Sequence, residues 1–190
     1  MSQGRKNKIA IVGHTRGIGK AIADLYDKKG FEVLGLSRSN GFDIIQDQEK
    51  IIESIEGSDL VVLNAHADRG QLNLLKRIYG LYAFDKMKVA VITSTSGLEE
   101  EPDYGQFKVW DKFKYVQYCE IKKELIQYIS ELQEELLNRP LSVYDICPDV
   151  VDTDMTKGLW NNLPKLTAQE VADAVRYCFE STFNVNKIVL

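Results

Sequence analysis

The sequence has no apolar run long enough to cross a lipid bilayer, and its first seven residues are polar and basic. A membrane helix needs about 20 consecutive apolar residues, and a secretory signal needs an apolar core, so we expect neither. The only cysteines are Cys119, Cys147 and Cys178, which are odd in number and widely separated. This spacing does not match a disulfide framework or a zinc site, and it favours reduced thiols in a cytoplasmic protein.

A strong excess of charge is missing as well. The 24 Lys and Arg residues and 28 Asp and Glu residues give a formal charge of -4, spread along the whole chain. This balance argues against nucleic acid or an anionic membrane as a general partner, so any anion site must be local. The only histidines, His14 and His66, have no third ligand beside them, and we expect no metal site. With 190 residues, 44% of them hydrophobic, residues 1–190 suit one globular domain.

What the chain does contain is a glycine-rich turn within residues 8–23, KIAIVGHTRGIGKAIA. An apolar run ends at Gly13, a polar turn follows with Gly17 and Gly19, and apolar residues resume at helical spacing. This pattern predicts a strand, a tight turn and a helix. Glycines let the backbone approach a phosphate, and a helix N-terminus attracts one. The pattern therefore indicates a nucleotide site, although an ordinary strand-to-helix turn would look similar.

Strands and helices are expected to alternate along the whole chain. This alternation predicts a single-domain Rossmann-type doubly wound parallel sheet of about six to seven strands, with helices on both faces. The carboxyl ends of the strands, where such sheets bind ligands, fall at Gly13, Ser37, Asn64, Ser94 and Pro148. We expect strands at 9–12, 31–36, 60–63, 89–92, 141–146 and 187–190, a possible short strand at 41–45, a loop at 98–111, and helices at about 17–29, 51–55, 72–85, 112–138 and from 167 onward.

The long helix expected over residues 112–138 has an irregular apolar stripe. Four positions of this stripe are leucine or isoleucine, but the two preceding positions are Tyr118 and Lys122. A lysine on a buried stripe is costly unless its ammonium reaches water or a polar group. Either the helix leaves the core here and Lys122 extends to solvent, or Tyr118 and Lys122, one turn apart, face a cleft. In the second case the ammonium would lower the tyrosine pKa from about 10.

Taken in order, these residues give the chain a family resemblance. It resembles a shortened member of the short-chain dehydrogenases/reductases, of the classical type, over nearly its whole length. The resemblance rests on GHTRGIG at 13–19, LNAH at 63–66, ITSTSG at 92–97, YCEIK at 118–122 and PDVVDTDM at 148–155. The sequence departs from the family where His66 and Asp149 replace glycines, and the resemblance leaves the effect of these two residues open.

The resemblance implies a nicotinamide-dependent reaction between a carbonyl and an alcohol. In this reading Tyr118 is the general acid or base, Lys122 binds the nicotinamide ribose and lowers the Tyr118 pKa, and Ser94 hydrogen-bonds the substrate oxygen. Ser94 is preferred to Ser96 because the family has a glycine three residues after its catalytic serine, and Gly97 fits only Ser94. The family's fourth catalytic residue, an asparagine, could match only Asn73, which may equally be a helix-terminus residue.

Charge at the end of the second strand bears on the cofactor. An NAD site usually has a carboxylate there, whereas this chain has Ser37, Arg38 and Ser39. A second cation, Arg16, lies in the glycine turn, where the resemblance associates it with a 2′-phosphate. We therefore predict NADP(H). The predicted cofactor-binding residues are Gly13, Thr15, Arg16, Gly17, Ile18, Gly19, Ser37, Arg38, Asp43, Ile44, Asn64, Ala65, Tyr118, Lys122, Pro148, Val151 and Thr153.

Two of these assignments have a purely structural alternative. Asp43 and Ile44 resemble the family's adenine-contacting pair, but they could equally be a loop aspartate and a core isoleucine. Thr153 is predicted to hold the nicotinamide carboxamide.

The predicted function is an NADP(H)-dependent oxidoreductase acting on a small carbonyl or alcohol. Its alternative is an NADP(H)-binding sensor or scaffold with little turnover. The expected substrate wall consists of Tyr104, Trp110, Met155, Leu159 and Trp160. The resemblance also implies a homo-oligomer, a dimer or tetramer, formed through the outer face of the long helix at Tyr115, Ile126 and Leu137.

Overall fold

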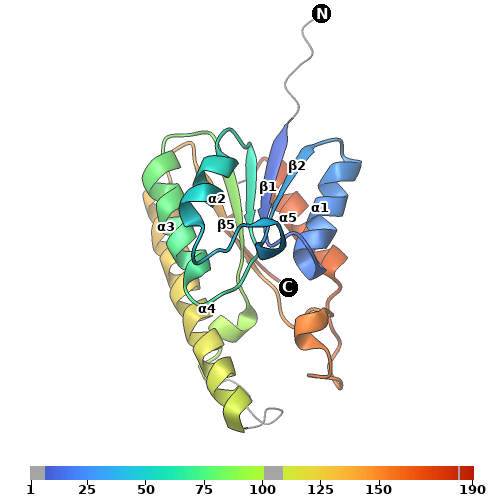
Figure 1. The fold of residues 1–190 in the computed structure, drawn as a ribbon. Helices are drawn as coiled ribbons and strands as arrows, with labels where there is room; N and C mark the ends of the chain where they lie inside the picture. The colour runs from blue at the N-terminus through green and yellow to red at the C-terminus, as the bar shows by residue number, and fades with distance from the viewer. Residues whose placement is uncertain (1–6, 101–108, 184) are drawn as a thin grey trace, which may run out of the picture.

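Six parallel strands form one sheet in the order β2-β1-β3-β4-β5-β6 (Figure 1). This computed structural model describes residues 7–100, 109–183 and 185–190. Strands and helices alternate along the chain, which gives a Rossmann-type α/β fold. The elements are β1 (Lys8–Val12), α1 (Gly17–Lys28), β2 (Glu32–Leu36), η1 (Arg38–Asn40), α2 (Gln48–Ile55), β3 (Leu60–Leu63), α3 (Gly70–Tyr82), β4 (Lys88–Ile92), η2 (Thr95–Gly97), α4 (Val109–Glu135), β5 (Ser142–Cys147), η3 (Asp154–Thr156), α5 (Ala168–Glu180) and β6 (Lys187–Val189).

Helices cover both faces of the sheet, as predicted (Figure 1). On β1, Ala10 and Val12 belong to the core under α2, α3 and α4, whereas Ile9 and Ile11 belong to the core under α1 and α5. Successive side chains of a strand point to opposite faces, so one continuous apolar run supplies both cores. The same reasoning explains why all four residues of β3 are buried.

The segment at 41–45, predicted as a possible third strand, forms turns, and that prediction is wrong. Gly41 has a left-handed φ of 84°. The carboxylate of Asp43 accepts hydrogen bonds from the backbone N–H groups of Ile45 at 2.8 Å and Gln46 at 3.3 Å. An aspartate that satisfies the following backbone donors in this way favours a turn over a strand. The sheet therefore ends at β2.

The longest helix, α4, begins at Val109, so the predicted loop at 98–111 is wrong over its last three residues; residues 101–108 lie outside the described part of the chain. Its apolar stripe packs against the sheet as expected, because Leu125, Ile129 and Leu132 are fully buried. Neither α4 nor any other helix in the described ranges is long and apolar enough to cross a membrane.

Gly97 lets η2 pack directly on α4. A Cβ added at Gly97 would lie 2.7 Å from the carbonyl carbon of Lys122 and 2.8 Å from the backbone nitrogen of Lys123. These contacts are with backbone atoms, which cannot move aside without shifting the helix. Gly97 thus sets the separation between the end of β4 and the helix that carries Lys122.

We predict opposite effects of alanine at two glycines. Gly97→Ala should lower the free energy of unfolding by about 1–3 kcal/mol, because the new methyl group overpacks against the α4 backbone. Gly80→Ala is the control, since Gly80 is exposed within α3 and an added Cβ meets nothing within 4 Å. It should raise stability by about 0.5–1 kcal/mol. Urea denaturation measures both, and an unchanged Gly97→Ala protein would contradict the close packing.

Candidate active site

The glycine turn connects β1 to α1 at the carboxyl edge of the sheet. Gly13 and Gly17 have left-handed φ values of 92° and 54°, which disfavour other residues. A Cβ on Gly19 would lie 2.0 Å from the Gly13 carbonyl oxygen, and a Cβ on Gly13 would lie 2.7 Å from the Ala65 nitrogen. The three glycine positions therefore leave no room for side chains and form a cradle in front of the α1 N-terminus, which suits a phosphate.

Asn64 and Ala65 attach the next strand end to this turn. The Asn64 side chain donates a hydrogen bond to the Gly13 carbonyl at 2.8 Å. The backbone N–H groups of Asn64 and Ala65 both donate to the Val12 carbonyl, at 3.0 and 2.8 Å. These bonds fix the loop after β3 against the glycine turn, and both residues lie where the sequence predicted them, at the carboxyl edge.

Ser94 and Tyr118 meet between the end of β4 and α4. Ser94 is buried, and its hydroxyl accepts a hydrogen bond from the Ser96 backbone N–H at 3.3 Å. Ser94 also forms a side-chain hydrogen bond with Tyr118, whereas Ser96 pairs with Tyr115 at 3.1 Å. The structure thus places Ser94, and not Ser96, beside Tyr118.

Lys122 is buried and does not extend to solvent, which decides between the two interpretations of the α4 stripe. Its side chain is 3% exposed. The ammonium donates hydrogen bonds to the Gln71 side-chain oxygen and to the Ile92 carbonyl, both at 2.9 Å. It lies 5.7 Å from the centre of the Tyr118 ring. The buried ammonium of Lys122 therefore lies beside the Tyr118 ring, at the end of β4.

Burial governs the protonation of both residues. It lowers the pKa of the Lys122 ammonium to about 8, although the nearby carboxylate of Asp145 acts in the opposite direction. It raises the pKa of the Tyr118 hydroxyl above its usual value, and the hydrogen bond with Ser94 only partly opposes this rise. The expected lowering of the Tyr118 pKa by Lys122 is wrong for this arrangement, because burial of the hydroxyl raises the pKa and the opposing effect comes from Ser94.

Gln71 joins this site, and the sequence analysis missed it. It is 1% exposed at the start of α3, and its amide donates to the carbonyls of Leu63 at 2.6 Å and Ile92 at 2.9 Å. Its side-chain oxygen accepts a hydrogen bond from the Lys122 ammonium. A signal was available, because Gln71 lies four and seven residues before the buried Leu75 and Ile78, on the same helical stripe.

Asn73, the possible fourth catalytic residue, is exposed on α3, and the α3 residue in contact with Lys122 is Gln71. Asn73 is therefore outside this cluster.

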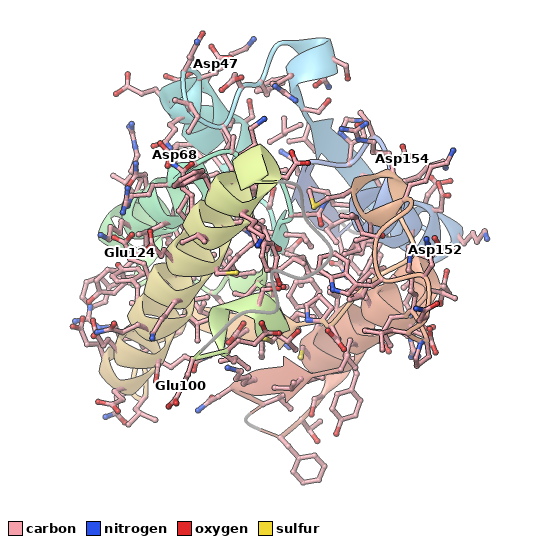
Figure 2. The ribbon with its side chains drawn as sticks, turned by 90° about the horizontal axis from the view of Figure 1, so that it is seen from below. Asp47, Asp68, Glu100, Glu124, Asp152 and Asp154 are labelled. Atoms are coloured by element: carbon pink, nitrogen blue, oxygen red, sulfur yellow. The ribbon has the colours of Figure 1, made fainter. Side chains whose placement is uncertain are left out.

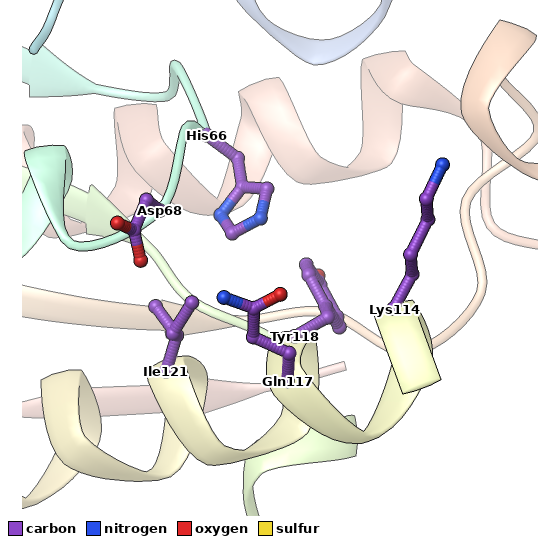
Figure 3. Close-up of a pocket in the computed structure, with 6 residues that line it drawn as sticks. All are labelled: His66, Asp68, Lys114, Gln117, Tyr118 and Ile121. Atoms are coloured by element: carbon purple, nitrogen blue, oxygen red, sulfur yellow. The ribbon is translucent and has the colours of Figure 1, made fainter. Parts of the chain in front are cut away.

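A pocket of about 210 Å³ opens beside Tyr118, between α4 and the loop that follows β3 (Figure 3). Most of its wall is polar. Figure 3 shows the His66 ring above the side chains of Gln117 and Tyr118. The lining residues are His66, Asp68, Lys114, Gln117, Tyr118 and Ile121.

The segment after Pro148 reaches the glycine turn. A Cβ added at Gly17 would lie 3.1 Å from the Thr153 methyl group, so these two predicted cofactor residues are neighbours. Thr153 begins η3 through a capping box with Thr156. Pro148 and Val151 are buried. The Asp149 carboxylate, in place of the family's glycine, accepts a hydrogen bond from the Thr95 hydroxyl at 3.0 Å and so ties this segment to η2.

The two predicted cations both lie at the carboxyl edge. Arg16 is the N-cap of α1, and its guanidinium lies 3.9 Å from the Asp154 carboxylate, with both side chains about three-quarters exposed. An ion pair this exposed contributes little stability. Arg38 is exposed in η1, just after Ser37. Figure 2, which looks onto this edge, shows Asp152 and Asp154 on one side of it and Asp68 and Glu124 beside α4.

The remaining residues predicted to contact the dinucleotide differ in their exposure and packing. Thr15 is exposed in the glycine turn, and Ile18 packs partly on the core under α1. Ile44 is 3% exposed and belongs to the core, while Asp43 closes the turn described above. This is the arrangement expected from the structural alternative, and an adenine contact by this pair stays a prediction.

The predicted substrate wall is only partly described. Tyr104 and the side chain of Trp110 lie outside the described residues. Trp160, in a left-handed backbone conformation with φ of 48°, packs 5.8 Å from the Tyr115 ring, while Met155 is exposed. Tyr115 stacks on Tyr118 at 6.3 Å and so faces the site, which makes its predicted place on the outer face of α4 wrong.

Two other groups of side chains bear on the chemistry. Cys119, Cys147 and Cys178 are buried and unpaired. Within the described ranges no three His, Cys, Asp or Glu side chains come together as a metal site.

The chain was compared with known proteins. No model of a protein family matches it. The curated 3-oxoacyl-(acyl-carrier-protein) reductase FabG of Vibrio cholerae is 28% identical over an alignment of 192 positions. The alignment covers 81% of this chain and 78% of the relative.

Solved structures with the same fold include two complexes with nicotinamide cofactors. A small-chain dehydrogenase in complex with NADPH has a TM-score of 0.76 and 18% identity, over 98% of this chain and 97% of the other. A 3-ketoacyl-(acyl-carrier-protein) reductase from Brucella melitensis, complexed with NADH, has a TM-score of 0.76 and 13% identity, over 97% and 96% of the two chains.

The fold, the ordered motifs and the curated relative agree with one another. The carboxyl edge carries the glycine turn, Ser94 and the pair of Tyr118 and Lys122. The chain is therefore similar to short-chain dehydrogenases/reductases in fold and in sequence.

Proposed function

We propose that this protein is an NADP(H)-dependent oxidoreductase that interconverts a small carbonyl compound and its alcohol, with Tyr118 as general acid and base. The observation that carries the proposal is the meeting of Ser94, Tyr118 and the buried Lys122 at one strand edge, beside a glycine turn. Burial of a lysine ammonium costs free energy, and a role of the ammonium in a reaction would explain why the protein buries it.

In the direction of carbonyl reduction, each of the three side chains has a separate role. Tyr118 holds its proton at neutral pH, because burial raises the pKa of its hydroxyl. It can therefore donate that proton to a carbonyl oxygen as negative charge develops there. Ser94, hydrogen-bonded to Tyr118, stabilises the same oxygen. Lys122 supplies a fixed positive charge beside the ring. A bound nicotinamide would supply the hydride in this direction and accept it in the other.

The glycine cradle fits the diphosphate of a dinucleotide. The cofactor residues in this proposal are those predicted from the sequence, with Gly13, Gly17 and Gly19 at the diphosphate and Asn64, Tyr118, Lys122 and Thr153 toward the nicotinamide. The preference for NADP(H) over NAD(H) rests on charge, since Arg16 and Arg38 lie at the ends of the paired strands β1 and β2. No carboxylate follows β2 within residues 37–40.

An NADP(H)-binding sensor without turnover is the alternative. A sensor has no need of a serine, a tyrosine and a buried lysine at one point, so their meeting favours the enzyme. We further propose that residues 1–190 form a single catalytic domain, that the protein is cytoplasmic, and that it forms a homo-oligomer. Of the residues predicted for the oligomer interface, Leu137 is 67% exposed and Ile126 is partly buried.

The general-acid role predicts a selective loss. Tyr118→Phe should lower kcat for NADPH-dependent reduction of aldehydes, ketones or quinones by about 10²- to 10⁴-fold and leave NADPH binding in place. The matched control is Tyr128→Phe, about three turns further along α4 and partly buried against the core; it should keep full activity. The measurement is NADPH absorbance with a panel of carbonyl compounds. Tight NADPH binding with no turnover of any of them would instead support the sensor.

The cofactor preference has its own test. Arg38→Asp should shift the ratio of NADPH to NADH affinity by about tenfold or more toward NADH, because the new carboxylate repels the 2′-phosphate and accepts a hydrogen bond from a 2′-hydroxyl. Arg77→Asp, a charge reversal on α3 where Arg77 pairs with Glu49, is the control and should not change the ratio. Isothermal titration measures both affinities. An unchanged ratio in Arg38→Asp would refute the charge argument.

Gln71 is proposed as a positioning residue for Lys122, with an effect on pH dependence. The pKa of Lys122 is about 8, so activity that requires the ammonium should fall as pH rises through this value. Gln71→Glu adds a carboxylate beside the ammonium and should move this fall to higher pH, whereas Gln71→Leu removes an acceptor and should move it to lower pH. The profile of kcat/KM against pH reports the shift.

The control for this profile is Gln127→Leu, because Gln127 lies on the exposed side of α4 and its side-chain amide donates a hydrogen bond to Glu131. Coincident profiles of wild type, Gln71→Glu and Gln71→Leu would show that Gln71 does not act on Lys122.

A further inference from the structure

His66 occupies a position where the resemblance leads to glycine, and its ring contacts the proposed general acid directly. The imidazole lies edge-on to the Tyr118 ring, with ring centres 4.9 Å apart and planes at 79°. Such edge-to-face contacts are favourable between aromatic rings. His66 therefore forms part of the same pocket wall as Tyr118 (Figure 3).

One nitrogen of this imidazole lacks a partner. Nδ1 of His66 is buried and has no hydrogen-bond partner within the part of the chain that the structure describes. Buried polar atoms in folded proteins nearly always have partners, and exceptions mark places where a ligand, ion or water completes the bond. The imidazole is also neutral near pH 7, because burial and the charge of Lys122 lower its pKa to about 4. A neutral imidazole has one donor and one acceptor nitrogen.

The pocket around His66 suits a hydroxylated ligand better than an apolar one. Its volume is about 210 Å³, and Asp68, Lys114 and Gln117 line it together with His66, while Ile121 is its only aliphatic side chain. An uncharged group that can both donate and accept hydrogen bonds would satisfy these side chains and the buried nitrogen. Hydroxyl groups have this property.

We propose that His66 binds a ligand hydroxyl through its buried Nδ1, next to the reacting position at Tyr118. The hydroxyl belongs either to the nicotinamide ribose or to a hydroxyaldehyde or hydroxyketone substrate. The proposal rests on the function proposed above, and it makes His66 a specificity-determining residue of the same site.

Two substitutions separate hydrogen bonding from ring packing. His66→Phe keeps an aromatic ring against Tyr118 and removes both nitrogens. His66→Asn removes the ring and retains a polar side-chain atom near the position of Nδ1. NADPH affinity is measured for each by isothermal titration. KM is measured for glyceraldehyde and for propanal, which has the same chain length and no hydroxyls, and melting temperature is measured without ligand.

We expect His66→Phe to lower either the NADPH affinity or the preference for glyceraldehyde over propanal by about 3- to 10-fold, the size of one neutral hydrogen bond. His66→Asn should recover most of this loss. A loss in NADPH affinity assigns the hydroxyl to the ribose, and a loss in the preference for glyceraldehyde over propanal assigns it to the substrate. The melting temperature of ligand-free His66→Phe should equal or exceed that of wild type, because a buried unpaired nitrogen has been removed.

Unchanged NADPH affinity together with an unchanged substrate preference in His66→Phe would overturn the proposal. Equal losses in both variants, with a lower melting temperature, would also overturn it, since they indicate ring packing alone. A wild-type protein that binds NADPH but reduces neither aldehyde counts against the proposed function for these substrates. In that case the NADPH affinities of the two variants still decide the role of His66.

Discussion

The buried ammonium of Lys122 is the constraint on which the rest of the site depends. An ammonium removed from water is stabilised only where oxygen atoms surround it, and here they come from Gln71 on α3 and from the Ile92 carbonyl at the end of β4. Gln71 is held in turn by the carbonyls of Leu63 and Ile92. Two strand ends and two helices are thereby fixed relative to one charge, and Tyr118, one turn before Lys122, is fixed with them.

Close backbone approach is the second constraint, and glycines provide it. At Gly13, Gly19 and Gly97 a Cβ would overlap backbone atoms of a neighbouring segment. Gly13 brings the loop after β3 against the turn after β1, Gly19 brings the start of α1 against Gly13, and Gly97 brings η2 against α4. Because these contacts involve backbone and not flexible side chains, the spacing between the cradle, Ser94 and Tyr118 is fixed by the fold itself.

The surroundings of Tyr118 favour the protonated phenol. Burial raises the pKa of the Tyr118 hydroxyl. The Lys122 ammonium donates hydrogen bonds to the Gln71 side chain and to the Ile92 carbonyl. His66 and Tyr115 cover two sides of the phenol ring. These surroundings favour the protonated form of Tyr118, which is the form that the proposed general acid needs.

The sequence by itself determined the alternation of strands and helices and the edge of the sheet at which Ser94, Tyr118 and Lys122 lie, because periodicity and glycine spacing are local properties of the chain. The roles of these three residues stay predictions. It misjudged residues 41–45, where Asp43 satisfies the backbone in a turn, and the start of α4. Only the tertiary structure showed that Gln71 accepts a hydrogen bond from Lys122, that Tyr115 stacks on Tyr118 and that burial raises the pKa of Tyr118. Partners distant in sequence and the loss of water at a buried atom arise when segments pack together, and no local pattern encodes them.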